Sequence, residues 1–142
     1  MVDEKVFVDK LRHINRYTAD LRQMQDVPEQ EYLNDVVIQR AVERTLMNLI
    51  QGRIDLAQHV RSTEGLSPSG TAKREMEALE VAVILSTETR ERMEEAVGFR
   101  NVLAHQYGNI DHEIVYEVLR DDLHWFERFQ QEPARWFQQH HS

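Results

Sequence analysis

The chain has 142 residues, of which 41% are hydrophobic and 30% charged, and it carries a formal net charge of −8. This size fits one compact domain, the composition excludes an intrinsically disordered chain, and the acidic balance argues against a protein that coats nucleic acid through a broad basic face. Cysteine is absent, which excludes disulfides, a thiolate nucleophile and a cysteine-ligated zinc site.

Apolar residues recur at three- and four-residue steps along most of the chain, and turn signals are few because there are only five glycines and three prolines. A first helix is predicted over about 3–25. It ends before Val27-Pro28, because the residue before a proline avoids the helical region. The second helix begins at Glu29 or Asp35 and runs to Thr63.

A loop over 66–70 separates these two helices from the rest of the chain. A third helix is predicted over about 71–85. Ser86 or Thr87 then caps a fourth helix, which ends before Gly108-Asn109. Asp111 caps a fifth helix, whose inward apolar residues continue to Phe129.

The predicted fold is all-α, a bundle of four to five mostly antiparallel helices in a single domain over 1–142, with 132–142 as a loose tail. No stretch approaches the roughly 20 consecutive apolar residues of a membrane-spanning helix. The N-terminus lacks the basic and apolar segments of a secretory signal. We therefore expect a cytoplasmic protein.

No metal or cofactor is expected from the motifs of the chain. A di-metal carboxylate bundle needs two Glu-x-x-His units, and the nearest match is the single Asp-x-x-His of Asp121 to His124. There is no His-Glu-x-x-His, no P-loop and no Gly-rich dinucleotide turn.

Among seven histidines, His105 stands apart, because Arg100 lies five positions before it and Tyr107 two after it. Asn101 and His105 are four apart and share a helical face, as do Arg100 and Tyr107, which are seven apart. Arg100 and His105 would point about 140° apart on a straight helix. They converge only if the helix bulges or ends near His105.

The run from Gly98 to Tyr107 resembles the signature of HEPN-domain toxins of the HepT type: arginine, a polar residue, three spacers, histidine, any residue, tyrosine. Asn101 fills the polar position, and residues 111–129 resemble the closing helix of the family. A weaker likeness extends to Glu43-Arg44-Thr45-Leu46, so that the resemblance covers most of the chain.

The resemblance implies a HEPN-like homodimer with metal-independent endoribonuclease activity, in which the two motifs face each other across the two-fold axis. It also implies a partner, a small nucleotidyltransferase antitoxin of the MntA type, which attaches adenylate to the motif tyrosine, here Tyr107. Arg100, His105 and Asn101 would be the catalytic residues.

The chemistry is sensible on its own terms. RNA is cleaved without metal when its 2′-OH attacks the adjacent phosphate, which calls for a base, an acid and a cation. Histidine titrates near roughly pH 6.5 and serves as either base or acid. A symmetric dimer supplies two copies of His105 and of Arg100 in one cleft, and Asn101 orients His105 or binds a phosphate oxygen.

Structural interpretations of the same residues remain open. Arg100 alone reads as an exposed arginine paired with Glu94 or Glu95, and His105 as a helix-end histidine. Tyr107 alone reads as a core or interface aromatic residue. Their joint spacing favours a functional site, whereas a solvated face is expected for Arg40, Glu43 and Arg44.

Two other functions are compatible with the sequence. In the first, the chain is a non-catalytic interaction module that docks a nucleotidyltransferase and is modified by it. The acidic balance favours this alternative, since a dimer doubles the negative charge and RNA must then be guided by local arginines. In the second, the chain is a purely structural bundle.

Overall fold

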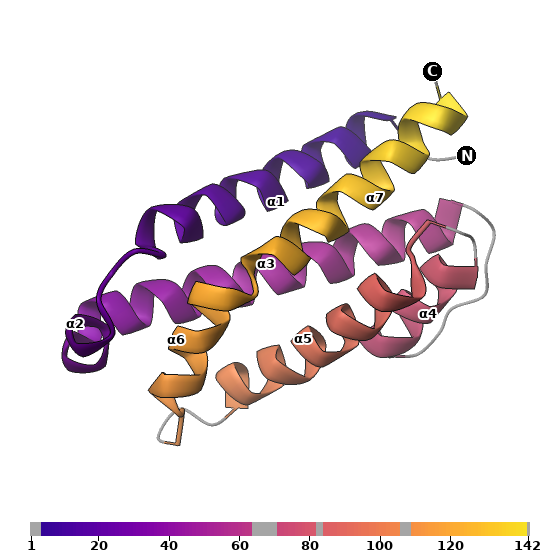
Figure 1. Cartoon of the computed structure of the whole chain (residues 1–142). Helices are drawn as coiled ribbons and strands as arrows, with labels where there is room; N and C mark the ends of the chain where they lie inside the picture. The colour runs from indigo at the N-terminus through magenta and orange to yellow at the C-terminus, as the bar shows by residue number, and fades with distance from the viewer. Residues whose placement is uncertain (1–3, 64–70, 82–83, 106–108, 142) are drawn as a thin grey trace.

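The computed structural model describes residues 4–63, 71–81, 84–105 and 109–141, which form seven helices and no strand (Figure 1). The helices are α1 (Glu4–Met24), α2 (Glu29–Asn34), α3 (Val36–Thr63), α4 (Ala72–Val81), α5 (Thr87–His105), α6 (His112–Asp121) and α7 (Leu123–His141). The predicted all-α bundle is thereby confirmed. The second predicted helix, expected to begin at Glu29 or Asp35, is α3 with the short α2 before it, and the fifth predicted helix is divided in two.

The first division falls at Asp35, between α2 and α3. Asp35 has an extended backbone, and its carboxylate accepts hydrogen bonds from the backbone nitrogens of Val37 and Ile38 at 3.0 and 3.2 Å. It therefore caps the start of α3. The side chain of Gln39 donates to the carbonyl of Tyr32 at 2.9 Å, which satisfies an acceptor at the end of α2.

The second division falls at Asp122, where the single helix expected from Asp111 onward becomes α6 and α7. The backbone nitrogen of Asp122 still donates to Val118, but its φ of −109° and ψ of 0° leave the helical region. The chain changes direction there, so that α7 can run beside α1 (Figure 1).

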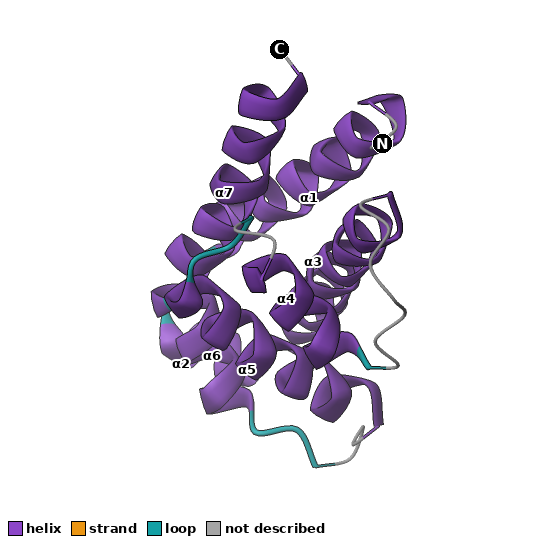
Figure 2. Cartoon of the chain, turned by 90° about the vertical axis from the view of Figure 1, so that its right-hand side faces the viewer, coloured by secondary structure: helices purple, strands orange, loops and turns teal. Residues whose placement is uncertain are grey.

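Helix α3 is the central element of the bundle. It packs against α1 on one side and against α4 and α5 on the other, and α7 lies against α1 and α5 (Figures 1 and 2). Its buried apolar side chains are Val42, Leu46, Leu49, Ile50, Ile54, Leu56, Ala57 and Val60. Because α1 and α5 both rest on α3, residues of the predicted motif on α5 face residues of α3.

The loose tail expected over 132–142 is not what the structure has, because α7 continues to His141 with Pro133 inside it. Trp136 is only 8% exposed, and the ring of Phe137 stacks on that of Phe7 with centroids 4.5 Å apart. A proline inside a helix removes one backbone hydrogen bond. The burial of two aromatic side chains against the bundle offsets that loss.

A buried cation connects α3 to α7. Arg53 is fully buried, and its Nη1 and Nη2 donate to the carbonyls of Leu49 and Phe126 at 3.2 and 2.7 Å. Its guanidinium carbon also lies 4.5 Å from the ring centroid of Phe126 and 5.3 Å from that of Phe129. Burial lowers the pKa of Arg53, and no described carboxylate forms an ion pair with it.

This arrangement predicts that shape and planarity matter more than charge at position 53. Arg53→Lys keeps a buried charge but loses the fork and the stacked plane, and should lower the free energy of unfolding by about 2 kcal/mol or more. Arg53→Met keeps most of the volume without a charge to desolvate and should be the more stable variant. Urea unfolding measures both, and a lysine variant more stable than the methionine variant would contradict the interpretation.

Candidate active site

Helix α5 carries the predicted site residues Arg100, Asn101 and His105. It begins after Ser86, whose hydroxyl oxygen accepts a hydrogen bond from the backbone nitrogen of Thr89 at 3.2 Å, as expected of a helix cap. Its buried side chains are Thr89, Met93, Val97 and Leu103. Because this stripe fixes the inward face, it also decides which residues of α5 face outward.

Arg100 is half-buried and reaches toward α3. Its Nη1 donates to Oε1 of Gln51 at 2.6 Å, and its Nε is buried with no hydrogen-bond partner in the described chain. Glu94 and Glu95 are engaged by other arginines of α5, at 3.0 and 3.6 Å. The surface ion pair that the sequence left open for Arg100 is therefore not formed with either of these two residues.

The partner of Arg100 is itself held in place. The amide Nε2 of Gln51 donates to Oδ1 of Asp55 at 3.0 Å, one turn further along α3. Since the amide nitrogen can only donate and the amide oxygen only accept, this bond turns the oxygen of Gln51 toward Arg100. Our sequence analysis missed Gln51, although its four-residue spacing to Asp55 was an available signal.

His105 is the last described residue of α5 and is exposed, and Asn101 is exposed one turn before it. The described part of α5 stops at His105, so the end or bulge that Arg100 and His105 need in order to converge stays a prediction. Tyr107, the predicted modification site, lies outside the described residues. The joint action of Arg100, His105 and Asn101 stays a prediction.

The face of α5 around Asn101 and His105 is open. A Cβ added to Gly98, one turn before Asn101, would meet no atom within 4 Å. Val102 is 38% exposed, and Ile114 on the neighbouring α6 is 49% exposed. Described residues of the same chain therefore leave space beside Gly98, and Val102 exposes apolar surface within the motif.

Glu43 departs from the solvated face expected for it. It is 6% exposed, with Oε1 3.2 Å from Nη1 of Arg40 and Oε2 3.5 Å from Nδ1 of His112 at the start of α6. Burial, and next the charge of Glu43, raise the pKa of Tyr32 well above its usual value. Arg40 and Arg44 are exposed as expected. Glu43 is turned inward because it shares the inner face of α3 with Gln39 and Leu46.

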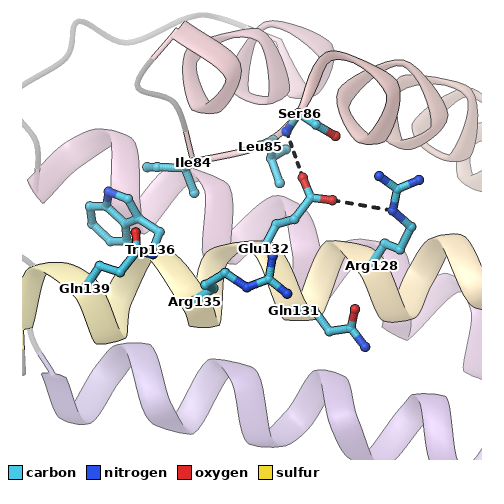
Figure 3. Close-up of a pocket in the computed structure, with 9 residues that line it drawn as sticks. All are labelled: Ile84, Leu85, Ser86, Arg128, Gln131, Glu132, Arg135, Trp136 and Gln139. Atoms are coloured by element: carbon cyan, nitrogen blue, oxygen red, sulfur yellow. Dashed lines mark hydrogen bonds and ion pairs between the residues drawn. The ribbon is translucent and has the colours of Figure 1, made fainter.

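A separate cavity of about 470 Å³ lies between the start of α5 and α7 (Figure 3). In it, Glu132 accepts a hydrogen bond from the backbone nitrogen of Ser86 at 2.7 Å and lies 3.8 Å from Nε of Arg128. The carboxylate of Glu132 is thereby engaged by groups of the same chain that join α5 to α7. This cavity is at the opposite end of α5 from His105 and does not include the motif.

Within the described ranges, no three histidine or acidic side chains come together as a set of metal ligands. The helices described include none that is long and apolar enough to cross a bilayer.

Comparison with known proteins places these observations in a family. The sequence profile described as "Ribonuclease HepT-like" matches residues 14–132. The chain is 27% identical over 118 residues to a tRNA nuclease HepT of Aphanizomenon flos-aquae, covering 83% of this chain and 80% of that protein. It is 23% identical over 124 residues to an mRNA nuclease HepT of Shewanella oneidensis, covering 87% and 92%.

A solved structure agrees with this fold. It is the tri-AMPylated Shewanella oneidensis HEPN toxin in complex with an MNT antitoxin, which superimposes with a TM-score of 0.86 at 20% identity and covers 94% of this chain and 99% of that one. At this identity the likeness establishes the shared fold.

Proposed function

This chain belongs to the ribonuclease HepT-like family, and we propose that it is a metal-independent endoribonuclease toxin with Arg100, His105 and Asn101 as its catalytic residues. The observation that carries the proposal is the set of contacts that Arg100 makes. Its guanidinium is oriented by the neutral amide of Gln51, and Glu94 and Glu95 are paired with other arginines of α5. An arginine held in this way is ready to bind a phosphate.

In the proposed reaction, one copy of His105 takes the proton of a ribose 2′-OH as the 2′-oxygen attacks the adjacent phosphorus. The bond from phosphorus to the 5′-oxygen breaks, and a second, protonated His105 gives that oxygen its proton. The products are a 2′,3′-cyclic phosphate and a 5′-OH. Arg100 stabilises the negative charge that develops on the phosphate oxygens, and Asn101 orients His105 or binds one of those oxygens.

The need for an acid and a base leads to a homodimer, because the motif supplies one histidine per chain. The open space beside Gly98 and the exposed side chain of Val102 support a second chain at this face of α5. Such a dimer would bring the two motifs together in a shared cleft.

We predict RNA cleavage by the unmodified protein in the presence of EDTA, with cyclic phosphate ends. Arg100→Ala should lower the rate by on the order of 10²-fold or more, and His105→Ala by at least as much. Arg16→Ala and His124→Ala, which remove the same side-chain types from exposed positions on α1 and α7, are the matched controls. A requirement for Mg²⁺, or equal loss in the controls, would mean that the site is misassigned.

We also predict that the active species is a dimer or an assembly of dimers. Light scattering across a dilution series should show activity and dimer mass falling together. Adding excess His105→Ala protein to the wild type should suppress cleavage, because a mixed dimer has only one copy of His105 in its cleft. A stable, fully active monomer is the result that rules out the shared cleft.

Tyr107 is the proposed point of regulation by a nucleotidyltransferase antitoxin of the MntA type. The AMP carried by the Shewanella toxin in its complex with an MNT antitoxin supports this. The phenol oxygen of Tyr107 would attack the α-phosphorus of ATP, lose its proton and displace pyrophosphate. The attached adenylate would place negative charge beside Arg100, where the RNA phosphate is to bind.

Co-expression with the antitoxin should therefore add one or more adenylate masses to the chain and silence it. Tyr107→Phe should fold, escape modification and stay toxic in the presence of the antitoxin, as judged by intact mass and growth. Tyr116→Phe is the control, since that phenol instead donates to the carbonyl of Val27 at 2.8 Å. If the antitoxin neutralises Tyr107→Phe as readily as wild type, it acts by occlusion.

A second candidate function is a non-catalytic module that docks the nucleotidyltransferase and is modified by it. The net charge of −8 favours this alternative, because it opposes the approach of RNA. Growth arrest on expression alone separates the two: arrest that His105→Ala relieves supports the nuclease, and arrest that survives this change points away from catalysis at α5.

A further inference from the structure

A groove lined by polar residues lies between α1 and α3 and includes Gln51, the partner of Arg100. It has a volume of about 320 Å³, and we call it the α1/α3 groove; the side chains that line it are Lys10, His13 and Tyr17 of α1 with Asn48, Gln51 and Asp55 of α3. Each set of three follows helical spacing, so the two helices present facing polar stripes. Gln51 belongs both to this groove and to the contact with Arg100.

The α1 wall offers a cation and an aromatic face. Lys10 makes no ion pair with any residue that the structure describes. Tyr17 is half-buried, so its ring is held by the bundle and still borders the groove. Nδ1 of His13 donates to the carbonyl of Asp9 at 2.8 Å, which leaves Nε2 free to bind a ligand.

The α3 wall offers hydrogen-bonding groups of both kinds. The amide of Asn48 donates and accepts, and the carboxylate of Asp55 accepts. Gln51 engages one oxygen of that carboxylate, Oδ1. A Cβ added to Gly52 would lie 3.4 Å from Cγ1 of Ile14, so the two helices approach closely where the groove has its floor.

These groups fit one class of ligand. Bases of single-stranded RNA stack on aromatic side chains and are read through amides and carboxylates, while lysine binds the phosphates. Asp55 repels a phosphate, which assigns the base to the α3 wall and the phosphate to Lys10. The groove thus matches a nucleotide. Lys10 would bind the phosphate, the ring of Tyr17 would stack on the base, and the amides of α3 would contact the edge of the base.

We propose that the α1/α3 groove binds a nucleotide of single-stranded RNA that lies beyond the two nucleotides flanking the phosphate held by Arg100. Because Gln51 touches Arg100 and also lines the groove, RNA bound at the proposed catalytic site continues directly into it. The inference rests on the proposed nuclease function and extends it, since it names the part of the chain that contacts RNA beyond the cleavage site.

The first test measures binding rather than cleavage. A fluorescent 12-nucleotide single-stranded RNA is titrated with protein in the His105→Ala background, and anisotropy is recorded at several salt concentrations. Lys10→Ala should weaken binding and reduce the slope of log K against log salt by about 0.7, the value for one lost phosphate contact. Lys5→Ala is the matched control, because Lys5 is exposed on α1 and lies outside the groove.

The aromatic contact is tested at the same time. Tyr17→Leu keeps apolar volume but removes the ring, and should weaken binding about tenfold, whereas Tyr17→Phe should bind as the parent does. Circular dichroism confirms that both variants are folded. If Lys10→Ala and Tyr17→Leu bind the RNA as tightly as Lys5→Ala does, the groove is not an RNA site and the inference is overturned.

A second arm separates this inference from the proposed activity. In the active protein, Lys10→Ala and Tyr17→Leu should raise KM for the 12-nucleotide RNA several-fold more than KM for a dinucleotide, because a dinucleotide lacks the nucleotide and the phosphate that would occupy the groove. If the wild type cleaves no RNA while both variants still weaken binding, the groove inference holds and the nuclease proposal fails. If the protein cleaves both substrates and neither variant changes KM or binding, the nuclease proposal holds and the groove inference fails.

Discussion

Arg100 is held against the central helix by a neutral partner. Its hydrogen bond to Gln51 fixes the position of the guanidinium without neutralising it, because an amide carries no net charge. A carboxylate in the same place would have satisfied both the geometry and the charge and left little reason to bind an anion. The orientation of Gln51 depends in turn on its hydrogen bond to Asp55. Two residues of α3 in series therefore position the guanidinium of Arg100.

The same contact explains how an acidic chain can be expected to bind RNA. At physiological ionic strength the Debye length is about 8 Å, so that exposed charges beyond that distance are largely screened. The net charge of −8 then slows the approach of RNA more than it weakens contact at a local group of cations. Arg100 contacts Gln51, Lys10 lines the same groove as Gln51, and neither cation forms an ion pair with a residue that the structure describes.

Local sequence was sufficient for the helices and for the candidate motif. Apolar periodicity predicted five helices, and the candidate motif lies on one of the helices that the structure has, α5. What could not be predicted depends on contacts between distant segments. Local apolar periodicity does not show that Asp122 ends one helix and begins another, because the gain is the packing of α7 along α1.

The same limit applies to individual side chains. Residues 132–142 were expected to form a loose tail, whereas the ring of Phe137 stacks on that of Phe7, 130 positions earlier, and holds α7 against α1. Glu43 was expected on a solvated face of α3, and the sequence analysis did not single out Gln51. One is buried beside His112 and the other is engaged by Arg100, and neither partner is near in sequence.

The most direct test of whether the site uses the uncompensated charge of Arg100 is the cleavage rate of Gln51→Glu under single-turnover conditions. This change replaces the side-chain amide of residue 51 by a carboxylate, whose oxygen takes the place of the one that now accepts from Arg100. The charge of the guanidinium would then be neutralised, and cleavage should fall by about tenfold or more although Arg100 and His105 are intact. Gln58→Glu adds the same charge two turns along α3 and should cleave as wild type does. If Gln51→Glu cleaves RNA as fast as Gln58→Glu, the uncompensated charge of Arg100 is not what the site uses.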